Sequence, residues 1–338
     1  MALIFAGVLF ATAAVSGAPA NRDRTTKRCQ SFAAPSGNDH ANGSRRAPFR
    51  TIARLVKAIS PGHAGCLLGG RYTEDVRLTN AGRPSEPFVL RAAPGARAAI
   101  CGKVEFKASA RYWRVNRLEI DGSCSVENTI QIYGDHIKLS HDDITNRHHP
   151  ANCVYIGGAK WGLASHFVLD HDRVHDCGTK GSDQMHGIYA DSSRDARISD
   201  NYIYANAGFG IHLYPDAQGT IVTRNVIDEN LTESGLVFGG QSPYASSNNI
   251  VRRNIFSRNA LYGVSSSWGG EHVGSANVAE ENCFWRNSAG PTSPSSRGYA
   301  TRANINANPR FVAADSHDYR VVPKSPCAAM QPRGTVGP

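Results

Sequence analysis

Charged residues are scarce in this chain of 338 residues, at 19% of the total, whereas apolar residues make up 41%. This balance excludes an intrinsically disordered chain, which needs high charge and few apolar side chains. The sequence also has no low-complexity stretch, no fibrous repeat and no nucleic-acid-binding motif, and its formal net charge of +9 is modest. We therefore expect a folded protein without a nucleic-acid partner.

Closely spaced cysteine pairs are absent as well. None of the eight cysteines forms the CxxC spacing that is typical of zinc and redox sites; they lie at positions 29, 66, 101, 124, 153, 177, 283 and 327. An even number of dispersed cysteines predicts structural disulfides formed in an oxidising compartment. The spacing leaves their connectivity open.

The first twenty residues contain no charged side chain. They are largely apolar and end in small residues, Ala18-Pro19-Ala20, as an export signal does. A membrane anchor is the alternative, because twenty uncharged residues can span a bilayer. However, the basic residues that follow, such as Arg22 and Arg24, lie on the wrong side for an anchor that displays its domain outside. We predict a signal peptide over residues 1–20 and a secreted protein, free or associated with the cell surface, with no membrane contact after cleavage.

The middle of the chain repeats a short pattern. An aliphatic residue, two or three polar residues and an Asn or Asp are followed by another apolar position, and the Asn or Asp recurs every 24 to 30 residues, at 142, 172, 201, 225, 254 and 282. A second motif, a short strand with alternating apolar residues, is centred on Ile130, Val154, Ile188, Ile211, Leu236 and Val264. Two or three such strands per repeat predict an all-β fold, a right-handed parallel β-helix solenoid.

The repeat also predicts the roles of these two columns. Stacked Asn or Asp side chains can hydrogen-bond from one coil to the next, so we interpret that column as structural and not catalytic. The aliphatic column is expected to point inward and form the core. A single domain over residues 29–338 accounts for both.

An open solenoid needs covered ends. At the amino-terminal end Phe49, Ile52, Leu55, Val56 and Ile59 share one helical face, which predicts a capping α-helix over residues 48–60. At the other end we expect a closing segment over about residues 299–330.

Several of these segments resemble a known family. The runs Pro-Phe-Arg-Thr-Ile at 48–52, Gly-Gly-Arg-Tyr-Thr-Glu at 69–74 and Asn-Pro-Arg-Phe-Val at 308–312, together with the repeated coils, are similar to bacterial right-handed parallel β-helix repeat proteins of the pectate-lyase-like superfamily. The resemblance implies the fold and an extracellular polysaccharide as partner. It does not imply one activity, because the superfamily includes polysaccharide lyases, glycoside hydrolases, epimerases and non-catalytic surface proteins.

Polar and aromatic residues cluster in two adjacent coils, between residues 186 and 216. The expected register places Tyr189 beside His212 and Asp191 beside Tyr214 on an exposed sheet face. Glycines at 187, 208 and 210 are expected to leave room for a ligand there.

Removal of the C5 proton of a uronic acid requires a base, a proton donor and a group that neutralises the carboxylate. His212 and Tyr189 are the expected base and donor, and His186 and Asp191 are further catalytic candidates. Lys160, Arg194 or a bound Ca²⁺ would offset the carboxylate charge. The remaining expected substrate-binding residues are Tyr155, Tyr214 and Asp216.

The sequence thus predicts a monomeric, secreted polysaccharide lyase or epimerase that acts on an acidic, uronate-containing polysaccharide. Two alternatives stay open. A glycoside hydrolase would use Asp191 and Asp216, with Asp183 as a further carboxylate. A non-catalytic carbohydrate-binding protein would need none of these groups, and the chain lacks the lysine or arginine base motifs of the lyase subfamilies and has the epimerases' Asp-Pro-His motif only loosely, as Tyr214-Pro215-Asp216.

Overall fold

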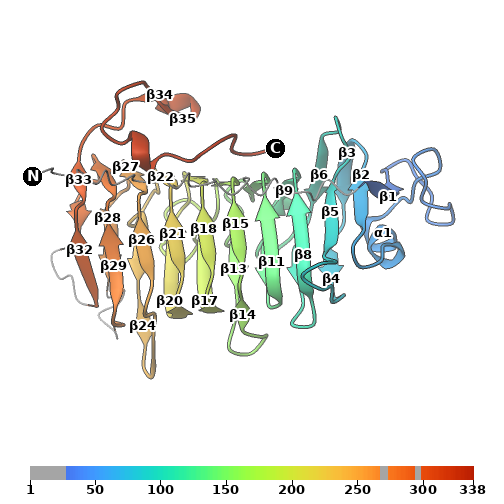
Figure 1. Cartoon of the computed structure of the whole chain (residues 1–338), viewed down its shortest axis with the longest axis horizontal. Coiled ribbons are helices and arrows are strands. Elements are labelled where there is room, and N and C mark those ends of the chain that lie inside the picture. The colour runs from blue at the N-terminus through green and yellow to red at the C-terminus, as the bar shows by residue number, and fades with distance from the viewer. Residues whose placement is uncertain (1–27, 267–272, 294–297) are drawn as a thin grey trace, which may run out of the picture.

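The computed structural model describes residues 28–266, 273–293 and 298–338, and the predicted signal peptide lies outside these ranges. The chain forms one elongated solenoid whose coils stack along the long axis of the molecule (Figure 1). Neighbouring coils pair through parallel strands, so the predicted parallel β-helix is confirmed.

Each complete coil contributes strands to three ladders that run the length of the solenoid. Ladder 1 contains β4 (Val76–Leu78), β7 (Val104–Phe106), β10 (Ile130–Ile132), β13 (Val154–Ile156), β17 (Ile188–Arg194), β20 (Ile211–Gln218), β23 (Leu236–Phe238), β28 (Tyr262–Ser266) and β31 (Gly290–Thr292). Ladder 2 contains β1 (Cys29–Ala33), β2 (Ala64–Leu67), β5 (Phe88–Ala92), β8 (Arg111–Asn116), β11 (Asp135–Ser140), β14 (Ala164–Ser165), β15 (Val168–Asp170), β18 (Arg197–Ser199), β21 (Ile221–Thr223), β26 (Ile250–Arg252), β29 (Asn277–Glu280) and β32 (Tyr299–Arg302). These two ladders form one 21-stranded sheet.

Ladder 3 is a separate 10-stranded sheet with β3 (Gly70–Thr73), β6 (Ala98–Cys101), β9 (Glu119–Asp121), β12 (Asp143–Thr145), β16 (Arg173–His175), β19 (Tyr202–Tyr204), β22 (Val226–Asp228), β27 (Ile255–Ser257), β30 (Cys283–Trp285) and β33 (Ile305–Asn306). Two small antiparallel pairs lie outside the ladders, β24 (Gly240–Gln241) with β25 (Tyr244–Ala245) and β34 (Phe311–Ala313) with β35 (Asp318–Val321). Short 3₁₀ helices occupy Gly122–Cys124, Ala314–Ser316 and Ala328–Met330.

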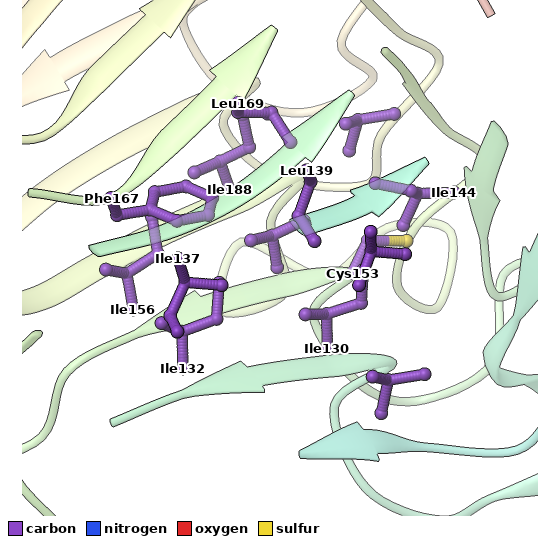
Figure 2. Close-up of a cluster of buried hydrophobic side chains, with 14 of the residues drawn as sticks. Ile130, Ile132, Ile137, Leu139, Ile144, Cys153, Ile156, Phe167, Leu169 and Ile188 are labelled. Carbon is purple, nitrogen blue, oxygen red and sulfur yellow. The ribbon is translucent and has the colours of Figure 1, made fainter. Parts of the chain in front are cut away.

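The predicted aliphatic column forms the interior of ladder 1. Ile130 pairs with Val154, Val154 with Ile188, and Ile188 with Ile211, in the register expected from the sequence. Figure 2 shows aliphatic side chains from successive coils, including Ile130, Ile137, Leu139, Ile144 and Ile188, packed together inside the solenoid. All five are fully buried, so each coil obtains its core only by stacking on its neighbours.

The predicted Asn/Asp column is a continuous hydrogen-bond ladder. Each side-chain oxygen accepts the backbone N–H of the equivalent residue in the preceding coil at 2.6–2.9 Å, through Asp142, Asp172, Asn201, Asn225, Asn254 and Asn282. Asn304 extends the ladder by one coil. A second column, which the sequence analysis missed, links Asn206, Asn230, Asn259 and Asn287 through their side chains: the Nδ2 of each residue donates to the Oδ1 of the next at 2.7–3.0 Å.

The amino-terminal end carries a helix, α1 (Ile52–Ala58), which lies within the predicted range 48–60 but is shorter at both ends. The Thr51 side chain caps it by accepting the N–H of Arg54 at 3.1 Å, and Glu74 accepts the N–H groups of Ile52 and Ala53. The apolar face of the helix, with Ile52 and Leu55 fully buried, covers the open core.

The carboxy-terminal segment leaves the three ladders after β33. After β33 the chain forms the β34–β35 hairpin and then runs back along the outside of ladder 3 towards the middle coils (Figure 1). Tyr319 is fully buried against Tyr202 and Tyr204, and Gly337 donates its N–H to the carbonyl of His171. This segment thus packs along one side of the solenoid.

All eight cysteines form disulfides, Cys29–Cys66, Cys101–Cys124, Cys153–Cys177 and Cys283–Cys327. The prediction of structural disulfides is confirmed, and the pairs are consistent with an extracellular protein. Within the described ranges, no helix has the length and apolar character needed to cross a membrane.

Candidate functional site

A groove runs over ladder 1 beside the predicted cluster. It encloses a volume of about 510 Å³, and its walls include Glu105, Glu127, Gln131, Tyr133, Tyr155 and Trp161. The outward positions of β7, β10 and β13 supply Glu105, Gln131 and Tyr155, since side chains alternate between core and surface along each strand. We call this region the ladder 1 groove.

Tyr155, a wall residue of the groove, forms a short hydrogen bond with Asp191 of the adjacent strand β17. The Tyr155 hydroxyl donates to the Asp191 carboxylate at 2.6 Å, and the Ser192 hydroxyl donates to the other carboxylate oxygen at 2.8 Å. Burial and the neighbouring Asp191 charge raise the pKa of Tyr155 far above its usual value. Tyr155 therefore stays protonated at neutral pH and holds the carboxylate in place.

Tyr189 lies next to this pair, as the register predicted. Its ring meets the Tyr155 ring edge-on, with centroids 5.2 Å apart, and stacks on His212 at 5.0 Å. Burial, with smaller contributions from Asp191 and Tyr214, raises the pKa of Tyr189. Tyr189 is therefore a neutral phenol at neutral pH.

The two histidines of the predicted site are not on an exposed face, and this part of the prediction is wrong. His186 and His212 are only 2% and 1% exposed. The ring centroids of Tyr189, Tyr214 and Phe209 all lie within 5.1 Å of the His212 ring centroid. An outward strand position does not imply exposure where large aromatic neighbours fold over it.

The buried imidazoles have defined protonation. Nδ1 of His186 accepts the N–H of Phe209 at 3.2 Å, so the proton of a neutral His186 lies on Nε2, which donates to Nδ1 of His212 at 2.7 Å. Burial lowers the pKa of His186 to about 3 and that of His212 well below its usual value. Both rings are therefore neutral, and they support Tyr189 from beneath instead of meeting a substrate.

The three glycines do not leave room for a ligand, which corrects a second expectation. A Cβ at Gly187 would lie 2.8 Å from the Asn206 amide, and one at Gly208 would lie 2.6 Å from Nδ1 of His186. At Gly210 the amide of Asn230 would be 2.8 Å away. These glycines make space for the protein's own asparagine column and histidine pair.

Arg194 and Asp216 pair with each other. Their side chains meet at 2.8 Å, and Gln218 donates to the second Asp216 oxygen at 2.9 Å. Asp216 is thus held in an ion pair with a guanidinium, whereas the side-chain donors to Asp191 are neutral hydroxyls, and this ion pair disfavours Asp216 as one of two hydrolytic carboxylates. Tyr214 lies one coil beyond Asp191, and its hydroxyl donates to Gln241 at 2.9 Å.

Lys160 and Trp161 lie in the loop between β13 and β14. The Trp161 side chain is 55% exposed, its ring centroid is 6.3 Å from that of Tyr133, and the Lys160 ammonium lies 5.1 Å from the indole. Sequence reasoning named Lys160 but missed Trp161. The sequence could have indicated Trp161, because a tryptophan between Gly158 and Gly162, in an insertion between two strands, is not expected to be buried in the core and is therefore a candidate for ligand binding.

The other end of the groove holds a charge network that the sequence analysis also missed. Glu105 pairs with Lys107 at 2.7 Å and with Arg77 at 3.1 Å, and Glu127 pairs with Lys103 at 2.7 Å. Burial of Glu105 opposes ionisation, but the hydrogen bonds from Lys107 and Arg77 outweigh it and lower the pKa of Glu105. The groove is thus polar and nearly charge-balanced, with aromatic walls.

Two clusters in the described part of the chain have metal-ligating side chains close together. One contains Asp135, His136 and His166, and the other Asp170, His171 and Asp200. The carboxylates of the second cluster are already engaged by Lys138 and Arg224. Both clusters lie outside the ladder 1 groove, and the expected Ca²⁺ stays a prediction.

Comparisons with known proteins agree with this architecture. The family model described as right handed beta helix region matches residues 104–245 and 182–305, which together span more than half of the chain. A pectate lyase PEL9 from Emericella nidulans is 35% identical over 74 residues, which are 21% of this chain and 18% of that protein. The matched part is thus less than a fifth of that relative's length.

Solved structures extend the likeness to nearly the whole chain. Pectate lyase Pel9A superposes with a TM-score of 0.66 at 15% identity, over 92% of this chain and 89% of that one. XylC in complex with xylose has a TM-score of 0.59 at 11% identity, over 81% and 69%. At such identities the likeness establishes the fold alone. With its three parallel ladders, its stacked core and this family match, the chain belongs to the right handed beta helix region family.

Proposed function

We propose that this protein is a secreted polysaccharide lyase or epimerase that acts on uronate-containing chains in the ladder 1 groove. The observation that carries the proposal is the hydrogen bond of 2.6 Å between Tyr155, which forms part of the groove wall, and Asp191, which lies behind it next to Tyr189. The Tyr155 hydroxyl orients the Asp191 carboxylate, and the protonated phenol of Tyr189 lies next to it. Abstraction of a proton and donation of another require such a pair of base and acid.

The roles follow from the protonation states. Asp191 accepts the C5 proton, and Tyr189 donates its proton to the departing O4 as the C4–O4 bond breaks and a C4=C5 double bond forms. Asp191 then loses its proton to solvent and Tyr189 regains one. In an epimerase Tyr189 would instead donate its own proton to the opposite face of C5, so that a C5–H bond is broken and another formed while the glycosidic bond stays intact, and Tyr189 then regains a proton as Asp191 loses one.

The histidines have a supporting role in this proposal. His212 stacks under Tyr189 at 5.0 Å, and His186 holds His212 through the imidazole–imidazole hydrogen bond. Because both are buried and neutral, they orient the phenol and do not exchange protons with the substrate. They are positioning residues, and not the base expected from the sequence.

Substrate binding would use the exposed groups along the groove. Trp161 offers an aromatic face for a sugar ring, and Lys160 beside it would neutralise the uronate carboxylate. Arg194 is less suited to that role because Asp216 already pairs with it. Similarity to proteins described as pectate lyases supports a polysaccharide substrate, and the four disulfides support the predicted secretion.

An activity assay on defined polysaccharides tests the proposal. The purified protein is incubated with polygalacturonate, alginate and glycosaminoglycans, and the ultraviolet absorbance of the conjugated double bond reports elimination. Deuterium incorporation at C5 without this absorbance reports epimerisation.

Point variants then test the assigned residues. We expect Asp191→Asn, Tyr189→Phe and Tyr155→Phe each to lower kcat by roughly 100-fold or more, the usual contribution of a positioned proton-transfer group. Tyr244→Phe is the matched control, since Tyr244 is exposed and lies in β25, outside the groove walls. Unchanged activity in the Asp191 and Tyr189 variants would refute the assigned roles, and a folded protein inactive on every glycan would favour carbohydrate binding without catalysis.

A further inference from the structure

A second cavity, of about 620 Å³, lies on a different side of the solenoid. It opens at the turn between β5 and β6, residues 91–98, and its walls include Arg117, Glu119, Asp143 and Pro338. None of its wall residues belongs to ladder 1. The run of chain that returns along ladder 3 therefore ends at this cavity, well separated from the ladder 1 groove in the fold.

Three arginines of the cavity wall have no acidic partner among the residues that the structure describes. Across residues 28–266, 273–293 and 298–338, the guanidinium groups of Arg91, Arg97 and Arg117 form no ion pair with a carboxylate. The Nε atom of Arg91 is buried and has no hydrogen-bond partner in that same part of the chain. A buried donor without a partner costs free energy, so a bound acceptor would stabilise it.

Other arginines at the same turn position have the carboxylate partner that Arg117 lacks among the described residues. Arg117, Arg224 and Arg253 all have left-handed backbone in the turn that leads from ladder 2 to ladder 3. Arg224 pairs with Asp200 of the preceding coil at 2.8 Å, and Arg253 pairs with Glu281 of the next coil at 2.5 Å. The equivalent residue after Arg117 is His141, which cannot supply a carboxylate.

The acidic residues of the cavity wall do not compensate these cations. Glu119 pairs with Arg147 at 3.4 Å, and Asp143 pairs with His175 at 2.7 Å. Burial and the Arg117 charge also lower the pKa of Arg91.

We propose that this cavity binds the oxyanion of a small ligand, with Arg91 and Arg117 as the principal contacts and Arg97 at the rim. Guanidinium groups bind carboxylates and sulfates through paired hydrogen bonds. The volume exceeds that of a single inorganic anion and falls in the range of pockets that hold small organic ligands. Because the proposed substrate is a uronate chain, we assign the carboxylate of an acidic sugar as the ligand group; this assignment rests on the proposed function, and the site is separate from the proposed catalytic groove.

Calorimetric titration of the full chain tests this assignment. The probes are sodium galacturonate, galactose as its uncharged counterpart, and sodium sulfate, all at constant ionic strength. The test variant is Arg91→Gln with Arg117→Gln, and the control is Arg111→Gln with Arg197→Gln, which removes the same charge from exposed residues outside both cavities. Circular dichroism of each variant verifies that it is folded.

We expect saturable galacturonate binding that weakens about tenfold or more in the test variant and stays unchanged in the control, with no binding of galactose that depends on these arginines. Sulfate binding with the same dependence and no such galacturonate binding would keep the anion site and overturn the sugar assignment. No saturable binding of either anion, or equal loss in test and control variants, would overturn the site. Polysaccharide cleavage is assayed separately, so failure of the proposed catalytic function would leave this result interpretable.

Discussion

The two aspartates in the otherwise amide-rich column provide a sharp test of how this solenoid is stabilised. Asp142 and Asp172 occupy adjacent coils and are fully buried. Burial raises the pKa of Asp142 to about 8 and that of Asp172 well above its usual value, and the charge of Asp142 adds to the shift of Asp172. Asn201, one coil further, is uncharged and donates Nδ2 hydrogen bonds to Leu169 at 3.1 Å and to Asn225 at 2.9 Å.

Replacing Asp142 by Asn should stabilise the protein at alkaline pH. The amide gains two donor hydrogen bonds of the Asn201 type, each worth about 1 kcal/mol, and loses the carboxylate contact with the N–H of Ser140. It also removes a buried charge, so we expect a net gain of about 2 kcal/mol in the free energy of unfolding at pH 8 to 9.

The effect should depend on pH with a definite sign. The folded-state pKa of Asp142 lies above its unfolded value of about 4, so the folded state binds more protons between about pH 4 and pH 8. The stability contributed by the protonated form is complete below pH 4 and is lost as the pH rises through 8. The advantage of Asp142→Asn should therefore be small in acid and grow with pH.

Thermal denaturation followed by circular dichroism at several pH values measures this difference in midpoint. Asp195→Asn, at an exposed turn position, is the control and should change little. A variant that is less stable than the parent at pH 8, or an advantage that does not change with pH, would refute the reasoning.

Three further predictions concern other parts of the fold. Leu139→Ala should cost about 2 to 5 kcal/mol in urea denaturation, because Leu139 is fully buried and its removal leaves a cavity; a loss under 1 kcal/mol would contradict the stacked core. Replacing Cys283 and Cys327 by Ala should destabilise the closing segment by about 2 to 4 kcal/mol, since the disulfide spans 44 residues, and limited proteolysis should then cut first after β33; cleavage elsewhere first would argue against a tether. The folded-state pKa of His186 is depressed to about 3, so its contribution to stability is present above the unfolded pKa of about 6.5 and lost as the pH falls below it; His186→Gln should make the acid dependence of the melting midpoint shallower, and an unchanged dependence would refute a buried neutral pair.

Local patterns were sufficient to predict the solenoid. The parallel register was predicted correctly from the recurring Asn or Asp and from the strands centred on residues such as Ile188. This was possible because every coil buries its apolar side chains at the same positions of the repeat. A local pattern also predicted the capping helix, since Leu55 and its apolar neighbours share one helical face. The Tyr189–His212 pairing followed from the same register.

The candidate site depended on packing that no local pattern encodes. Strand alternation placed His212 on the outer side of its sheet, but only the rings of Tyr189, Tyr214 and Phe209 decided that it is buried. The Tyr155–Asp191 contact joins side chains 36 residues apart. Asp191 also lies at the irregularity where the register of β17 with β20 shifts, between Ala190 and Ser192.

By itself, the sequence determined that this chain stacks parallel coils around an aliphatic core, that its cysteines pair, and that one end carries a helix, because composition and periodicity govern those features. The tertiary structure alone decided which cysteines pair, where the closing segment lies and which polar residues meet water. It also placed Arg117 at a turn that, within the described residues, lacks the carboxylate partner that Arg224 has in the preceding coil and Arg253 has in the next coil. These outcomes arise from contacts between residues more than twenty positions apart, whose geometry depends on every turn in between.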